Sequence, residues 1–331
     1  MKMTPSMLVG GSLLVFWASA SLMVFMPIAM MWDIKPSDQW IPLSKDEKEG
    51  LDLYKKNGCS YCHSLYIRVN DWYDGTERIS QAGDYNEMQP VILGTERTGP
   101  DLSQEGGLHP DDWHRAHFIN PRTTSPLSLM PRWEFLGREK IDRLIAYVQS
   151  LGGKNAKVRV ARQEFWKVQS VAAFEAGPDS NISWIHQHIP EVWRPMPNPY
   201  PATDADLAKG TRIYEQYCVN CHGLIGDGRG IAAQYLYPPP LNFTELRRNL
   251  IENKYIGGIF YYQIMNGITG TAMPFFKKFL ESDKIWSVSN YVAVYYVGYT
   301  DANIAPKGID ASYETIWKNP YPQPDTTKEK P

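Results

Sequence analysis

Four cysteines, arranged as two identical short motifs, are the residues of this 331-residue chain with the clearest potential for chemistry. Each motif reads Cys-x-x-Cys-His, and the second copy lies 159 residues after the first. This pattern attaches c-type haem, because two thiols add to the vinyl groups of the haem and the adjacent imidazole ligates the iron. The sequence therefore predicts two covalently bound haem c groups. The residues involved are Cys59, Cys62 and the iron ligand His63 in the first copy, and Cys218, Cys221 and the iron ligand His222 in the second.

Other uses of paired cysteines fit the sequence less well. A disulfide within each motif would close a loop too short to stabilise much chain. A zinc site could draw four thiolates from the two motifs, but the motifs are distant and both histidines would be left unused. A thioredoxin-like redox pair requires a βαβ context, which the sequence does not show. Haem attachment is the interpretation that uses every residue of both motifs.

The sixth iron ligand decides between electron transfer and chemistry on a substrate. Met130 lies 67 residues after the first motif's histidine, and Met273 lies 51 residues after the second's. Each is followed by proline and precedes the last helix expected in its half of the chain. A methionine ligand fills the coordination site and raises the reduction potential of haem iron. We therefore expect Met130 and Met273 to be the sixth ligands. The alternatives in the first half are His109, His114 and His117.

Two proline-containing loops are expected to hold the haem-ligating histidines in position. Pro100 lies within Thr-Gly-Pro-Asp-Leu at 98–102, and Pro240 ends a run of three prolines. A ligating histidine usually donates its second ring N–H to a backbone carbonyl, and a rigid loop suits that role. Arg97, Arg122 and Arg132 are candidate partners for haem propionates, although simple solvent exposure explains these arginines equally well.

An uncharged segment of 26 residues, 7–32, precedes both motifs. About 20 apolar residues cross a bilayer as a helix, whereas a cleaved signal peptide has an apolar region of only about 7–15 residues. We therefore expect an uncleaved single-pass anchor in the lipid bilayer. The flanking charges weakly favour an N-terminus inside the cell. Because c-type haem is attached in the periplasm, we expect the bulk of the chain there and the anchor in the inner (cytoplasmic) membrane.

The rest of the chain shows helical rather than strand patterns, and its elements repeat. Both halves have the order helix, Cys-x-x-Cys-His, loops, Met-Pro, helix, which indicates an internal repeat of two unlike copies. The first helix is expected to begin with a capping box formed by Ser44 and Glu47. The further expected elements are helices at 111–119, 137–151, 154–177, 204–217 and 282–297, and an extended proline-rich linker at 178–202.

The overall composition excludes one class of partner. The net charge is −2 with histidine neutral, so the chain has no basic excess with which to neutralise phosphates. Nucleic acid is therefore not an expected partner. The hydrophobic and charged fractions, 43% and 21%, are ordinary for a globular protein.

Residues 1–151 resemble the membrane-anchored mono-haem cytochrome c subunit of cbb3-type haem–copper oxidases. Besides the anchor, the resemblance rests on Cys-Ser-Tyr-Cys-His at 59–63, the segment 94–102, Glu-Gly-Gly at 105–107, Trp113 with His114 and His117, and the run from Asn120 to Pro131. Residues 203–300 resemble a generic class I cytochrome c domain, a pattern shared by many respiratory complexes. That second resemblance rests on the segments 210–217, 218–223, 226–228 and 270–274.

These resemblances imply a mainly α fold, with an N-terminal transmembrane helix and two class I cytochrome c domains. They imply ligation by His63 and Met130, and a periplasmic haem that passes electrons toward a haem–copper oxidase core subunit. The expected division is an anchor at 1–33, cytochrome c domain 1 at 34–152, a linker at 153–202, cytochrome c domain 2 at 203–300 and a C-terminal tail at 301–331.

The favoured function is that of a dihaem cytochrome subunit, not itself catalytic, of a cbb3-type or related terminal oxidase. It would relay electrons from a soluble or membrane-bound donor to the catalytic core. The mono-haem subunit normally lacks a second haem domain, so the cytochrome subunit of a nitric oxide reductase is an alternative. A dihaem peroxidase is another, but the two Met-Pro pairs and the anchor argue against it. A third alternative is a free-standing membrane-anchored electron carrier.

Overall fold

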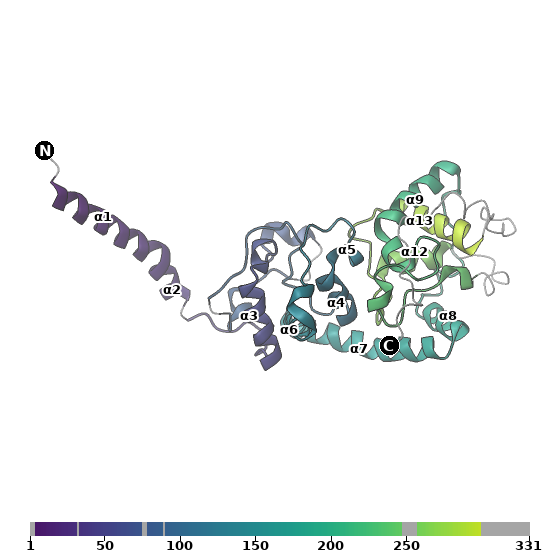
Figure 1. Cartoon of the computed structure of the whole chain (residues 1–331), viewed down its shortest axis with the longest axis horizontal. Coiled ribbons are helices and arrows are strands. Elements are labelled where there is room, and N and C mark those ends of the chain that lie inside the picture. Colours follow the sequence, from purple (N-terminus) through teal and green to yellow (C-terminus); the bar gives the residue numbers. More distant parts are fainter. Residues whose placement is uncertain (1–3, 32, 75–77, 89, 247–256, 299–331) are drawn as a thin grey trace, which may run out of the picture.

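The computed structural model describes residues 4–31, 33–74, 78–88, 90–246 and 257–298. All regular secondary structure in these residues is helical, and none of them forms a strand, which confirms the expected mainly α class. A long N-terminal helix leads to two helical halves that lie next to each other along the longest axis of the molecule (Figure 1). The expected C-terminal tail, 301–331, lies outside the described residues.

The N-terminal segment is a single apolar rod. It comprises α1 (Pro5–Ala20), a π-helical turn (Ser21–Phe25) and α2 (Met26–Met31). Its most apolar stretch has a mean hydropathy of 2.0, and none of that stretch is buried within the protein. Figure 1 shows the rod extending away from the two halves. By length and composition it can cross a bilayer. Pro27 does not end the helix; the wider π turn lies just before it, where a proline removes a helical hydrogen bond and crowds the preceding turn.

The first half is built on two crossing helices, α3 (Lys45–Lys56) and α6 (Gly137–Ser150). The expected capping box opens α3: the Ser44 hydroxyl accepts from the Glu47 N–H, and the Glu47 carboxylate accepts from the Ser44 N–H. Gly58 follows the helix with a φ of 68°, a conformation that favours glycine. The helices of this half are α3 (Lys45–Lys56), α4 (Asp111–Ile119), α5 (Pro121–Thr124) and α6 (Gly137–Ser150), with 3-10 turns at Cys59–Tyr61, Val69–Asp74, Ala82–Tyr85 and Glu134–Leu136.

The second half repeats this plan with helices α9 (Asp204–Tyr217) and α13 (Ser282–Tyr291). Both helices were expected, and α13 continues through a π-helical turn that ends at Gly298, with a φ of 88°. Helix α12 was not expected, because it is apolar on all sides and so shows no amphipathic period; it lies in the core. The elements are α9 (Asp204–Tyr217), α10 (Val219–His222), α12 (Gly257–Asn266), α13 (Ser282–Tyr291) and the π turn Val292–Val297, with 3-10 turns at Ala233–Tyr235 and Phe243–Glu245.

The same close helix crossing occurs in both halves. A Cβ atom on Gly50 of α3 would lie 2.0 Å from the carbonyl oxygen of Arg143 in α6. A Cβ atom on Gly210 of α9 would lie 2.4 Å from the carbonyl oxygen of Ser287 in α13. Only glycine lets the backbones approach this closely at each crossing. The structure thus shows that the sequence repeat corresponds to a repeated packing arrangement.

Between the halves lie α7 (Gly153–Glu175) and α8 (Pro178–Gln187). The expected connecting helix at 154–177 is confirmed by α7. The expectation of an extended chain at 178–202 is wrong for its first part, which forms α8. Pro178 occupies the first helical position, where it is tolerated, and Ile182 and Ile185 are buried, so packing stabilises this short helix.

Helix α7 runs beside both halves and ties them together (Figure 1). In the first half, the Arg159 side chain donates to the carbonyl oxygens of Gly106, at 2.7 Å, and Gln104, at 2.9 Å. In the second half, the buried Ser170 hydroxyl donates to the carbonyl oxygen of Gly270, at 2.8 Å. These contacts fix α7 to both halves, so that it holds them in a defined arrangement.

Candidate haem sites

Both Cys-x-x-Cys-His motifs form a single tight turn after the first helix of their half. The His63 N–H donates to the carbonyl oxygen of Cys59 at 3.0 Å, and the His222 N–H donates to that of Cys218 at 2.9 Å. All four thiols are free. The turn therefore brings two thiols and one imidazole to the same short stretch of backbone in each half.

The two imidazoles are held in the same way. His63 Nδ1 lies 2.8 Å from the carbonyl oxygen of Pro100, and His222 Nδ1 lies 3.2 Å from that of Leu241. Because a carbonyl can only accept, each Nδ1 carries the proton and each Nε2 keeps its lone pair. Burial lowers the pKa of both rings, that of His222 to about 4, so both are neutral at pH 7. Each ring can therefore offer Nε2 to a metal.

The two proline loops differ in how they reach the histidine. Pro100 itself supplies the carbonyl that accepts from His63. In the second loop the accepting carbonyl belongs to Leu241, the residue after Pro240. The Pro240 carbonyl instead lies where Gly228 approaches, 2.4 Å from the position a Cβ on that glycine would take. A direct contact of Pro240 with the cofactor stays a prediction.

Glycine and aromatic residues complete the surroundings of the two rings. A Cβ atom on Gly99 would lie 2.3 Å from Cε1 of His63, so only glycine leaves space for this ring in its present position. The ring of Phe243 stacks on that of His222, with centroids 4.4 Å apart and planes 16° apart. Each imidazole is therefore fixed by packing as well as by its hydrogen bond.

The two methionines predicted as sixth ligands occupy equivalent turns. The Met130 N–H donates to the Ser128 hydroxyl at 3.2 Å, and the Met273 N–H donates to the Thr271 hydroxyl at 3.2 Å. Each methionine is partly buried against the same core cluster as the first cysteine of its motif. Ligation by either methionine stays a prediction.

The environment of three of the four thiols argues against a reactive thiolate pair. Burial raises the pKa of the Cys218 and Cys221 thiols to about 12 and that of the Cys59 thiol to about 11. These three thiols are neutral at pH 7, whereas a nucleophilic cysteine needs a lowered pKa. A neutral thioether is compatible with such an environment.

A buried donor in the first half tests the fit of a haem. The indole Nε1 of Trp133 is buried and has no hydrogen-bond partner among the described residues. Trp133 packs against the same core cluster as Met130 and Cys59. An indole N–H can only donate, and a haem brings two carboxylates that can accept. The residues present therefore fit a haem, and this donor is unexplained without an acceptor.

Two of the three arginines considered as propionate partners, Arg97 and Arg122, differ in the structure. Arg97 donates to the Ser64 hydroxyl at 2.7 Å and pairs with Asp71 at 3.0 Å, so its charge is already matched within the protein. The Arg122 side chain is exposed, and the Arg122 carbonyl accepts a hydrogen bond from the Asn220 amide at 2.5 Å. Contact of Arg122 with a propionate stays a prediction.

The second motif is in contact with the first half. Trp113 and Ala116 of α4 pack in one cluster with Cys221, and the Tyr237 N–H donates to the Asp112 carboxylate at 3.1 Å. The sequence did not indicate this interface, because the residues that form it are ordinary small and aromatic side chains without a pattern of their own.

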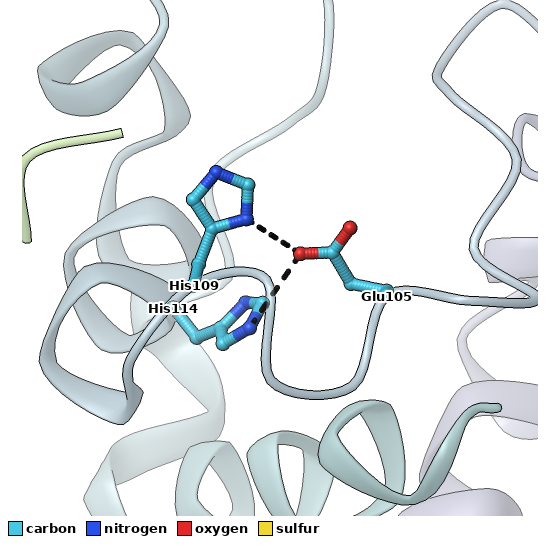
Figure 2. Close-up of side chains that lie close together, drawn as sticks. All are labelled: Glu105, His109 and His114. Carbon is cyan, nitrogen blue, oxygen red and sulfur yellow. Dashed lines mark hydrogen bonds and ion pairs between the residues drawn. The ribbon is translucent and has the colours of Figure 1, made fainter. Parts of the chain in front are cut away.

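The sequence also did not predict a cluster that involves two of the three histidines weighed as alternative iron ligands. His109 and His114 converge on Glu105 at the start of α4 (Figure 2). His117 does not belong to this cluster. Its Nδ1 lies 2.7 Å from the Thr124 hydroxyl instead. Glu105 and His114 are nine residues apart in the sequence, so only the turn at 105–108 brings them together.

Comparisons with known proteins assign both halves. Residues 1–150 match the family described as cytochrome c oxidase, mono-haem subunit/FixO, and residues 205–292 match the family described as cytochrome c oxidase, cbb3-type, subunit III. No curated protein is significantly similar to the chain. A solved structure, the Kuenenia stuttgartiensis reducing HAO-like protein complex, is 20% identical and covers 76% of this chain and 96% of its own, with a TM-score of 0.25. This TM-score is too low to indicate a shared fold.

Proposed function

We propose that this chain is a dihaem electron-relay subunit, because residues 1–150 match the mono-haem subunit family of cbb3-type oxidases and residues 205–292 match their subunit III family. It carries two covalently bound haem c groups and delivers electrons to the catalytic core of a cbb3-type haem–copper oxidase. The chain itself makes and breaks no bonds in the substrate of that oxidase.

The repetition of one site geometry in both halves is the observation that supports two haems. Each half has two free thiols and an imidazole on one turn, a carbonyl that orients the imidazole, and a hydroxyl that caps the methionine turn. A single haem would leave one of these two sets without a role. When bound, each haem supplies reversible one-electron oxidation and reduction of its iron.

The protein residues then have distinct tasks. The cysteines anchor the group, and His63 and His222 present a neutral Nε2 to the metal. Met130 and Met273 would each supply a thioether sulfur as a further iron ligand, which would keep water and small oxidants away from the iron and favour its reduced state. The proline loops hold each imidazole at one angle, so that little has to rearrange when the charge of the site changes.

We further propose the direction of electron flow and the placement of the chain. The first half follows the apolar helix directly and so lies near the membrane, where a core subunit would be embedded. The second half is farther along the chain and would receive electrons from a soluble or membrane-bound donor. The N-terminus would lie in the cytoplasm and both halves in the periplasm, because haem c is attached there.

The haem count can be measured on the full chain purified from membranes in mild detergent. We expect two haem c per chain by the pyridine haemochrome method. The double variants Cys59→Ala/Cys62→Ala and Cys218→Ala/Cys221→Ala should each retain one covalent haem, and His188→Gln, outside both motifs, should retain two. A value of one haem in the unmodified chain would contradict the proposal.

The relay function needs a separate measurement, namely which subunits co-purify with the anchored chain and what that material consumes. We expect a haem–copper core subunit and oxygen uptake driven by a reduced donor. Each double variant should lower the uptake while the core subunit remains bound. Recovery of the chain alone, or consumption of nitric oxide in place of oxygen, would contradict it.

A further inference from the structure

Three potential metal ligands meet at the start of α4, outside both haem motifs. Glu105 Oε1 lies 2.6 Å from His109 Nδ1 and 3.7 Å from His114 Nε2, and the three ligand atoms all lie within 4.8 Å of one another (Figure 2). Figure 2 shows both imidazoles directed toward the carboxylate. The three side chains are largely shielded from solvent, with 13%, 17% and 5% of their surfaces exposed.

One atom of this cluster is unexplained by the protein alone. The whole His114 residue, backbone included, is 4% exposed, and its Nε2 has no hydrogen-bond partner among the described residues. The distance of 3.7 Å to Glu105 is too long for a hydrogen bond. A buried polar atom without a partner is costly, and native proteins rarely leave one. This nitrogen is aimed at the only carboxylate of the cluster, so a cation between the two would satisfy both.

We propose that Glu105, His109 and His114 bind a divalent transition-metal ion, with Zn²⁺ as the ion that best fits the donor set. Two neutral imidazoles and one carboxylate are a common zinc ligand set, and the carboxylate offsets half of the charge of the ion. Zinc takes these ligands at about 2.0–2.2 Å, so donor atoms of one site lie a little over 3 Å apart. Small side-chain rotations bring the present cluster to that geometry, and three protein ligands leave a fourth position for water.

The surrounding backbone is prepared to hold such a site. The turn that carries Glu105 is fixed from α7, because Arg159 donates to the carbonyl oxygens on either side of it, those of Gln104 and Gly106. The His109 ring stacks with that of Trp113, with centroids 3.8 Å apart, and is near-parallel to that of Phe275 of the second half, with centroids 6.3 Å apart. Metal binding would therefore stiffen the contact between the two halves.

This site does not depend on the proposed haem function. None of its three residues belongs to either Cys-x-x-Cys-His motif or to the methionine turns. The site would therefore bind metal whether or not electrons pass through the protein. Zinc binding therefore needs a readout other than oxidase activity, and binding stoichiometry provides one.

The test uses the full chain in detergent with its haem content verified, so that cysteine thiols cannot capture the ion. After treatment with a chelator and dialysis against Zn²⁺ alone, we expect one tightly bound zinc per chain by elemental analysis. Zinc-edge X-ray absorption should show nitrogen and oxygen neighbours at about 2.0–2.1 Å with the multiple scattering of imidazole and no sulfur.

Variants at the three positions separate this site from adventitious binding. Glu105→Gln, His109→Gln and His114→Gln should each weaken zinc binding at least tenfold, whereas His186→Gln, a histidine outside the cluster, should not change it. Zinc should also raise the melting temperature of the unmodified chain and of His186→Gln only. If His114→Gln fails to fold, the two less buried variants still decide the matter. Absence of stoichiometric zinc, or equal affinity in Glu105→Gln, would overturn the proposal and leave a hydrogen bond between Glu105 and His109.

Discussion

The side-chain amide of Asn220 donates a hydrogen bond to the backbone carbonyl of Arg122, with the two atoms 2.5 Å apart. Asn220 lies between the two cysteines of the second motif, and Arg122 lies in α5, eight residues before Met130 of the first half. The bond therefore joins the attachment turn of one candidate haem to the segment that leads to the other. Two candidate redox sites are held at a defined separation by contacts between their own elements.

Removal of this bond should loosen the contact between the halves. Asn220→Ala should cost roughly 1 kcal/mol of docking free energy, which corresponds to about a fivefold rise in the population with the halves apart. We expect slower electron exchange between the two haems in rapid-mixing experiments, with the haem content unchanged. Gln234→Ala, whose side chain bonds only within its own turn, is the control. Unchanged exchange in Asn220→Ala would show that the bond does not set the docking.

The helix crossings should tolerate no side chain larger than glycine. Gly50→Ala places a methyl group 2.0 Å from the Arg143 carbonyl oxygen, and Gly210→Ala places one 2.4 Å from that of Ser287. Such overpacking costs about 1–3 kcal/mol or more, so each variant should unfold at lower urea concentration. Asp52→Ala, on the exposed side of α3, should show the small effect of a surface change.

The space beside His63 should be equally restricted. Gly99→Ala would place its methyl group 2.3 Å from Cε1 of the imidazole, so the ring has to turn and its bond to Pro100 has to break. We expect an altered Soret spectrum and reduction potential for one of the two haems, because the orientation of the ligating ring changes. Glu96→Ala, an exposed position nearby, should leave both unchanged. A Gly99→Ala spectrum identical to that of the unmodified chain would count against His63 as the ligand.

Stability in acid should depend on Asp71. Hydrogen bonds from Arg68, with Arg97 adding to the effect, hold the pKa of this carboxyl well below its ordinary value of 3.8. Because folding favours the ionised form, this contribution to stability is fully present above about pH 3.8 and is lost as the pH falls toward the lowered folded-state pKa.

Asp71→Asn should therefore lower the urea midpoint at pH 7 and flatten its decline in acid. Asp52→Asn, an exposed carboxylate, is the matched control and should keep the steep decline. Parallel pH profiles for Asp71→Asn and the unmodified chain would mean that the two arginines do not stabilise this carboxylate.

The sequence alone predicted the helices whose apolar residues recur with a clear helical period. Helices α3, α9 and α13 were expected from apolar residues at helical spacing, and the start and end of α3 also follow from the Ser44 cap and from Gly58. Helix α12 was missed because its apolar residues surround it, and α8 was missed because a proline-rich stretch suggested an extended chain, although Pro178 only begins a helix.

The candidate sites divide in the same way. The cysteines, His63 and the loop at Pro100 were evident from local spacing, since the chemistry of attachment acts over a few residues. The Glu105 cluster and the contact of Asn220 with Arg122 were not evident, because each depends on how separate turns pack. Pairwise contacts across an interface leave no period in the sequence, so they had to come from the three-dimensional structure.

The attachment of α7 to both halves would affect how the rate of electron transfer between them depends on conditions. Because this helix fastens both halves through Arg159 and Ser170, one candidate haem site is presented to the other at a high effective concentration. Passage of an electron between them would then be a first-order event, indifferent to dilution and little affected by ionic strength. A diffusing carrier would instead have to collide with its acceptor for every electron, and its rate would fall on dilution.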